Sequence, residues 1–136
     1  MTKTINRTIS LLALMLIALS ASAASADYGR TLRVDYIFTG TASSTEIAVC
    51  ELSCFEGWAG RRHNLDSMPR KGNGQIVMRD AQSQQVLYMT SFSTLFQEWQ
   101  CTEEATRLRK SFENVFLLPM PSAKAVVSVT LFGFKG

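Results

Sequence analysis

The clearest strand signal in the chain is residues 31–39, TLRVDYIFT. Apolar side chains recur there at every second position. Successive side chains of a β-strand point to opposite faces, so this period of two predicts a strand. Its buried face should carry Leu32, Val34, Tyr36 and Phe38.

Similar signals on both sides of this stretch predict an all-β domain. The turn at residues 40–45 and the polar turn at residues 80–84 each join two strands into a hairpin. Six strands joined mostly as antiparallel neighbours indicate an antiparallel β-sandwich of the Greek-key or jelly-roll type, with one or two short helical turns. The strands after the first are expected at residues 46–51, 75–79, 85–90, 111–118 and 124–134.

Three local patterns make sharper predictions. Ile47 and Val49 should face the core, and Pro119 and Pro121 should end the fifth strand, which has Phe112, Val115 and Leu117 or their alternates inside. Residues 52–73 show no regular pattern and predict a long irregular connection. A helical period of one or two turns, or an aromatic loop, is expected from Phe92, Leu95, Phe96 and Trp99.

The N-terminus has the pattern of a secretory signal peptide. Lys3 and Arg7 precede an apolar stretch at residues 9–19, and small residues then lead to Ala-x-Ala sites that predict cleavage after Ala23 or Ala26. We favour residues 1–26 as the signal and residues 27–136 as one domain, exported to the periplasm or secreted. The alternative is an uncleaved anchor. No later apolar run is long enough to cross a bilayer.

Charge excludes a nucleic-acid function on electrostatic grounds. The whole chain has 14 basic and 11 acidic residues. Removing Lys3 and Arg7 leaves 12 − 11 = +1. A domain so close to neutral has no basic surface that would attract phosphates.

The most unusual stretch is residues 57–65, GWAGRRHNL. Arg61 and Arg62 can bind carboxylates or phosphates, and Trp58 can stack on a sugar or anchor an interface. The other interpretation is internal: Trp58 plugs the end of the sandwich, an arginine braces the loop, and His63 is a hydrogen-bonded loop residue. We treat Trp58, Arg61, Arg62 and His63 as candidates for interaction or for bracing the loop.

Three cysteines could form one disulfide in an oxidising compartment, and the sequence leaves the pairing of Cys50, Cys54 and Cys101 open. A zinc site made from these cysteines and His63 matches no standard ligand spacing. Because His63 is the only histidine, neither an H-E-x-x-H zinc motif nor a convincing Ser-His-Asp triad can be assembled. We therefore expect no catalytic activity, no metal and no cofactor.

Six segments in the same order resemble the N-terminal domain of the IgA-peptidase family of secreted bacterial zinc metallopeptidases (peptidase family M sixty-four). The resemblance implies a β-sandwich placed ahead of the zinc domain, which holds the family's catalytic residues. It implies none of those residues here, and it assigns no role to the cysteines. The segments are residues 31–40, 57–65, 72–76, 90–99, 112–119 and 129–132.

From the residues and the resemblance together, we expect a non-catalytic, exported accessory domain that makes domain or protein contacts. Its partner would be a separate metallopeptidase catalytic domain or another cell-surface protein. The alternatives are a carbohydrate- or surface-binding module that uses Trp58 and the arginines, and a truncated peptidase remnant.

Overall fold

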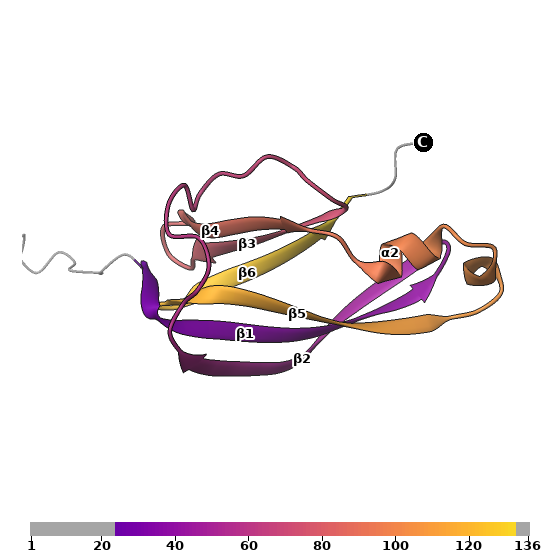
Figure 1. The fold of residues 1–136 in the computed structure, drawn as a ribbon, viewed down its shortest axis with the longest axis horizontal. Coiled ribbons are helices and arrows are strands. Elements are labelled where there is room, and N and C mark those ends of the chain that lie inside the picture. Colours follow the sequence, from indigo (N-terminus) through magenta and orange to yellow (C-terminus); the bar gives the residue numbers. More distant parts are fainter. Residues whose placement is uncertain (1–23, 133–136) are drawn as a thin grey trace, which may run out of the picture.

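A computed structural model describes residues 24–132 as two antiparallel three-stranded sheets packed face to face (Figure 1). The strand orders are β2-β1-β5 and β4-β3-β6. The antiparallel sandwich and both expected hairpins are confirmed. The strands are β1 (Ala26–Thr41), β2 (Ser44–Glu56), β3 (Gly74–Asp80), β4 (Val86–Phe92), β5 (Lys110–Pro121) and β6 (Ala125–Leu131).

Strand β1 is the centre of the first sheet and pairs with β2 on one side and β5 on the other. Val34, Tyr36 and Phe38 are at most 5% exposed, and Leu32 packs against the core, so the predicted buried face is confirmed. Burial raises the pKa of the Tyr36 hydroxyl above its ordinary value.

The core lies between the two sheets. Ile76 and Met78 of β3 are fully buried, as the pattern predicted. Phe92 of β4 contacts Phe116 of β5 with ring centroids 4.5 Å apart, and this pair connects the two sheets. Each fully buried large apolar side chain contributes about 1.5–3 kcal/mol to folding, so this interior is what holds the sheets together.

The aromatic segment after β4 is only partly helical. The α-helix α2 spans Leu95–Gln100, and the Thr94 side chain caps it by accepting from the Gln97 backbone N–H. Phe92 instead ends β4, and Leu95 is 69% exposed. The expected short helix is therefore present and includes Leu95, Phe96 and Trp99, but Phe92 lies outside it because the helix begins only after the strand has ended. A 3₁₀ turn at Glu104–Thr106 follows.

Strand β2 is longer than expected and faces the core differently. It runs to Glu56 because Arg30, ahead of the predicted first strand, still pairs with it, so the irregular connection begins at Gly57 rather than at residue 52. Ile47 and Val49 are 41% and 56% exposed, so the prediction that they are buried was wrong. They do point to the buried side of the sheet, opposite Phe38 and Tyr36, but β2 extends past the cover of the second sheet.

Strand β5 continues through both prolines, contrary to expectation. Pro119 is fully buried within the strand, and Pro121 is its last residue. A proline lacks a backbone N–H, but β5 is an edge strand and has a neighbour on one side only, so the ladder tolerates it. Of the two alternatives left open for its buried face, Phe116 and Leu118 are inside.

The expected signal peptide lies mostly outside the described residues, as do residues 133–134 of the expected last strand. Ala24, however, is 5% exposed and belongs to the core cluster. The Ser25 N–H donates to Ser122 Oγ at 2.8 Å. The part of the chain that the structure describes contains no helix long and apolar enough to cross a membrane.

Candidate functional site

The loop that follows β2 is tied to the start of β1. Gly57 has φ +82°, a left-handed conformation that glycine adopts without strain, and it turns the chain out of the strand. The Gly57 N–H donates to the Gly29 carbonyl at 2.6 Å, and the Thr31 hydroxyl donates to the Gly57 carbonyl. Both ends of this turn are therefore bonded to β1.

Trp58 lies inside the end of the sandwich and is 6% exposed. Its ring packs edge-on against Tyr88 of β4, with centroids 5.5 Å apart, and its indole N–H donates to the Arg61 carbonyl at 3.0 Å. A Cβ placed on Gly60 would lie 2.2 Å from the Trp58 ring, so the loop backbone lies directly on the indole. Little of the indole remains for a ligand to stack on.

The Arg61 guanidinium holds the loop to the second sheet. It donates to the Ser67 carbonyl at 2.9 Å and to the Met89 carbonyl of β4. It also lies over the Tyr88 ring, 5.6 Å from the centroid. These contacts use the fork of the guanidinium on backbone oxygens and not on a carboxylate or phosphate.

Arg62 and His63 lie nearer to solvent. Arg62 donates to the Trp58 carbonyl at 3.1 Å and lies over the Tyr28 ring, and the Tyr28 hydroxyl donates back to the Arg62 carbonyl at 3.3 Å. His63 is exposed. Of the four candidate residues, Trp58, Arg61 and Arg62 are brought together by the loop, and His63 lies exposed beside them.

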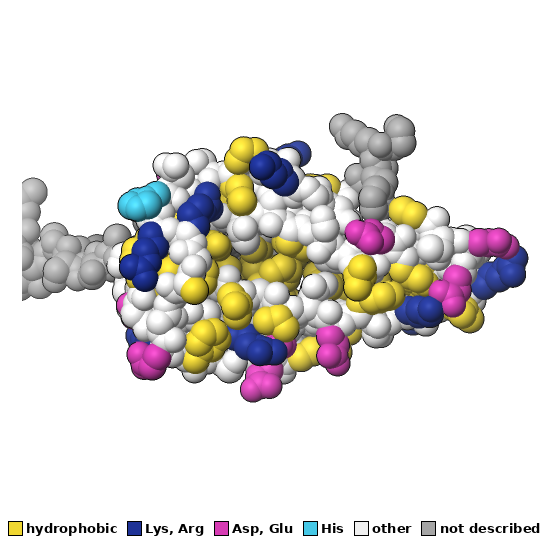
Figure 2. All heavy atoms as spheres, viewed as in Figure 1, with side chains coloured by type: hydrophobic (Ala, Val, Ile, Leu, Met, Phe, Trp, Pro, Cys, Tyr) yellow, Lys and Arg dark blue, Asp and Glu magenta, His cyan; other side chains and the backbone are white. Residues whose placement is uncertain are grey.

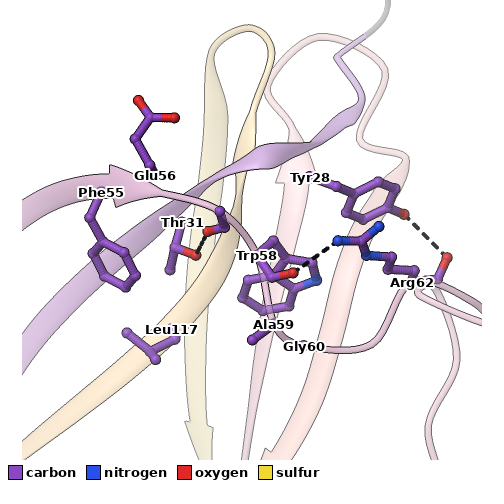
Figure 3. A pocket seen from close by; sticks show the side chains of 10 residues that line it. Tyr28, Thr31, Phe55, Glu56, Trp58, Ala59, Gly60, Arg62 and Leu117 are labelled. Carbon is purple, nitrogen blue, oxygen red and sulfur yellow. Dashed lines mark hydrogen bonds between the residues drawn. The ribbon is translucent and has the colours of Figure 1, made fainter.

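Beside this loop is an open, mostly apolar cavity of about 640 Å³ (Figure 3). In Figure 3, Phe55 and Leu117 lie on one side of it and Tyr28 and Arg62 on the other. Phe55 and Leu117 are 46% and 47% exposed, so their apolar surfaces are accessible. The lining residues are Tyr28, Thr31, Phe55, Glu56, Gly57, Trp58, Ala59, Gly60, Arg62 and Leu117.

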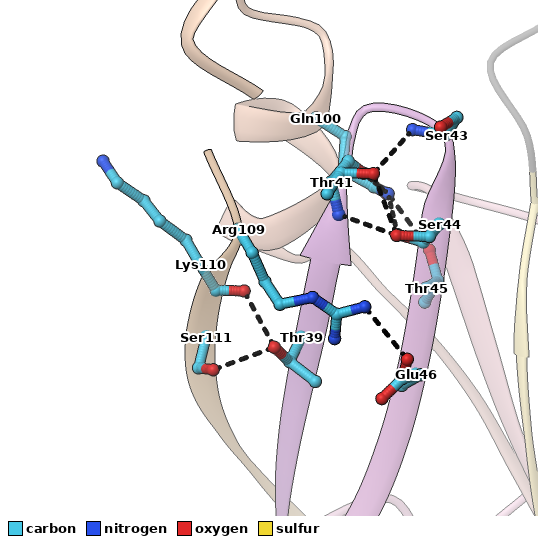
Figure 4. A network of polar contacts seen from close by, with 10 residues as sticks. All are labelled: Thr39, Thr41, Ser43, Ser44, Thr45, Glu46, Gln100, Arg109, Lys110 and Ser111. Carbon is cyan, nitrogen blue, oxygen red and sulfur yellow. Dashed lines mark hydrogen bonds and ion pairs between the residues drawn. The ribbon is translucent and has the colours of Figure 1, made fainter. Parts of the chain in front are cut away.

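The opposite end of the first sheet is held by a polar network (Figure 4). The Gln100 amide donates to the Thr41 and Ser44 carbonyls at 2.8 and 3.1 Å, which fixes the end of α2 to the turn between β1 and β2. Arg109 pairs with Glu46 at 3.0 Å and holds the pKa of that carboxyl below its usual range. Every group named here has a structural partner, so we assign this network to folding.

The cysteines are free and exposed in the structure. Cys50 is the extra residue of a β-bulge, because Asp35 pairs with Glu51 and Tyr36 with Val49. Cys54 lies four residues further along the same strand, or about 13 Å at the usual strand rise. A disulfide needs Cα atoms about 6 Å apart, so Cys50 and Cys54 cannot pair within this strand. Cys101 follows α2.

The described residues contain no candidate metal site. Across residues 24–132, no three His, Cys, Asp or Glu side chains are close enough together to hold a metal ion.

Sequence reasoning missed the exposed side chains of β2 and the cavity at its end. The bulge at Cys50 shifts the alternation by one residue, so Ile47 and Val49 share a face with Leu52 and not with Glu51. If the strand pattern had been continued past this one-residue shift to Phe55, the predicted strand would have been longer. That longer strand would not have revealed the cavity, because the loop and β5 form it from residues distant in sequence.

Comparison with known proteins places the chain in a family. A family model described as Peptidase M64 N-terminus matches residues 25–136, which is most of the chain and includes nearly all of the described fold. A comparison with curated protein sequences finds no match. The match confirms the resemblance seen in the sequence. The chain belongs to the family of N-terminal domains of M64 peptidases.

Proposed function

We propose that this domain is a non-catalytic, exported accessory module that binds the catalytic domain of an M64-type peptidase or another extracytoplasmic protein. The family match over residues 25–136 carries the proposal, because the matched region is the part that accompanies the peptidase. The accessible apolar surface around Phe55 and Leu117 supports it, since exposed apolar patches rimmed by polar groups mark interaction sites.

The site chemistry supports a binding role over a catalytic one. A general base must be within hydrogen-bond reach of its substrate and oriented by a third group. His63 is exposed on a loop whose neighbouring arginines are bonded to backbone carbonyls. The arginines thus stabilise the conformation of the loop, so the loop would contribute to binding through its exposed surface.

Export is part of the proposal, and we propose signal cleavage after Ala23 in place of Ala26, the site that the sequence pattern favoured. Cleavage after Ala26 would remove Ala24 from the core and the Ser25 bond to Ser122. Cleavage after Ala23 keeps both. Mass measurement of the exported protein should therefore give a chain that begins at Ala24.

The test of the function is a binding titration. The mature chain is mixed with the separately produced catalytic domain of an M64 peptidase, and heat release and peptidase activity are measured. Saturable binding is expected, with no peptide cleavage by the mature chain alone in the presence of zinc. Zinc-dependent, chelator-sensitive cleavage by the mature chain alone would overturn the non-catalytic assignment.

The carbohydrate-binding alternative is disfavoured by the position of Trp58. Sugar rings bind to open aromatic faces, but this indole is 6% exposed and packed on Gly60 and Tyr88. A glycan array that shows specific binding by wild type, lost on Trp58→Ala in a variant that circular dichroism shows to be folded, would restore this alternative.

A further inference from the structure

Strand β2 presents a long unpaired edge. It has 13 residues, is the outermost strand of the sheet and is bonded only to β1. The backbone N–H and C=O groups on its other side are open to pairing with an added strand. Proteins usually protect such an edge with lysine, proline or a covering segment, but β2 reads STEIAVCELSCFE and has neither residue type. Its only interruption is the bulge at Cys50.

One side of this edge is an apolar ledge continuous with the core. Ile47, Val49 and Leu52 are 41%, 56% and 63% exposed. Each lies opposite a buried residue of β1, respectively Phe38, Tyr36 and Val34, and residues paired across strands point to the same face. An added strand would therefore place its own apolar side chains next to this ledge and extend the core by one strand.

The other side of the edge is acidic. Glu46 and Glu51 lie opposite Thr39 and Asp35 on the outer face of β1. Glu46 is already paired with Arg109, and the Arg33–Asp35 pair beside Glu51 is neutral as a whole, so Glu51 is the acidic group left for a partner in the middle of the strand. β2 contains a third glutamate at its end but no lysine or arginine. In Figure 2, acidic and hydrophobic side chains and one basic side chain lie along the lower margin, where Figure 1 places β2. The edge therefore favours a partner with basic side chains on this face.

We propose that β2 binds an extended segment of a partner protein, in which apolar residues alternate with lysine or arginine, by adding it as a fourth strand to the sheet. The apolar residues would cover Ile47, Val49 and Leu52, and the basic ones would lie on the face of the edge that carries Glu51. The backbone hydrogen bonds supply affinity and the alternate side chains supply specificity, as in other strand-addition complexes.

A second copy of this chain fits the edge less well. Pairing β2 with itself would bring together two strands that each carry three glutamates and no basic residue. Like charges close together on paired strands are destabilising. Phe55, near the end of β2, also lines the 640 Å³ cavity. A segment that runs along the edge would therefore reach this accessible apolar cavity.

The inference rests on the proposed function and names the surface that would serve it. A direct test uses synthetic peptides of about nine residues, the length of a long strand. One alternates valine and lysine, one alternates valine and glutamate, and one has the valine–lysine composition in scrambled order. We expect the alternating lysine peptide to bind with a Kd below about 1 mM and to protect amides of residues 44–56 from hydrogen exchange. The other two should bind at least about tenfold more weakly.

Matched variants locate the contact. Glu51→Lys reverses a charge on β2, and Leu52→Lys places a charge on the ledge. Their controls are Glu113→Lys on β5 and Val126→Lys on β6, which are exposed positions on strands that do not pair with β2. The β2 variants should weaken the lysine peptide about tenfold, and the controls should change its affinity less than about twofold.

Four results would overturn the proposal. They are no detectable binding at peptide concentrations up to about 5 mM, equal affinity for the glutamate or scrambled peptide, an equal loss of affinity in the control variants, or dimers of the free chain whose β2 amides are protected from exchange. The same variants separate this inference from the proposed function. If the M64 catalytic domain binds wild type and Leu52→Lys equally, the accessory function stands and the strand-addition surface falls. If the peptide binds β2 but the catalytic domain does not bind, the reverse holds.

Discussion

Replacing Gly60 by alanine should destabilise the domain only when Trp58 is present. The added Cβ would lie 2.2 Å from Trp58 Cζ2 and 2.7 Å from Cε2 and Cη2, closer than real carbon contacts. The ring or the loop must then move, and overpacking of this kind costs about 1–3 kcal/mol. The φ of Gly60 is not positive, so alanine adds no backbone strain.

A double-mutant cycle isolates this contact. Trp58→Ala alone should cost about 3 kcal/mol, at the lower end for a buried tryptophan, because a loop can close part of the gap. With the indole gone, Gly60→Ala should be neutral, or stabilising by about 0.4–1 kcal/mol, because alanine lowers the entropy of the unfolded chain. The coupling between the two positions should therefore be about 2 kcal/mol, a value expected for residues in direct contact.

The assay is urea unfolding followed by circular dichroism, which does not depend on the removed indole. At roughly 4–8 °C per kcal/mol for a domain of this size, Trp58→Ala should also lower Tm by about 12 °C or more. Gly57→Ala is the control: its φ of +82° makes alanine strained, but nothing lies within 4 Å of the added Cβ, so its cost should add to that of Trp58→Ala. Equal destabilisation by Gly60→Ala with and without Trp58 would refute the packing that we describe.

Three further predictions follow from the same structure. The Asp80 carboxylate accepts a hydrogen bond from the Ser83 hydroxyl, and this bond is the main cause of its lowered pKa. Its contribution to folding stability is therefore present above the unfolded pKa of about 3.9 and is lost as pH falls through the lower folded pKa. Asp80→Asn should make stability depend less on pH between about pH 2 and 5, and thermal melts that show the same loss of stability in acid as wild type would contradict this. Cys50 and Cys54 should not be bridged in the purified oxidised protein, and peptide mapping after alkylation without reduction would reveal such a bridge. Arg61→Ala should cost about 1.5 kcal/mol by removing two charged hydrogen bonds to backbone carbonyls, and chemical denaturation that shows no loss would mean that the loop does not depend on them.

Much of the fold could be predicted from local pattern. The alternation in residues 31–39 correctly placed Val34, Tyr36 and Phe38 in the core, and the alternation at residues 75–79 did so for Ile76 and Met78. The short polar turns identified the two hairpins. These features depend on neighbours in sequence, which is why a single chain is enough to read them.

The candidate site was predicted less completely. The clustering of Trp58, Arg61 and Arg62 was visible in the sequence, but their partners were not. Trp58 packs on Tyr88, and Arg61 donates to the Met89 carbonyl. Both partners come from a strand that begins more than twenty residues later. Spacing along the chain carries no information about such contacts.

The residues alone were enough to predict an antiparallel β domain, the apolar side of the strands at residues 31–39 and 75–79, and the family resemblance. Which apolar sides are covered depends on contacts between distant parts of the chain. Ile47 and Phe38 are paired and point to the same side, yet one is 41% exposed and the other is fully buried. Alternation sets the direction of a side chain, whereas burial depends on whether a second sheet reaches over it. The second sheet of this domain does not cover β2, and that is why the apolar side of this strand stays exposed.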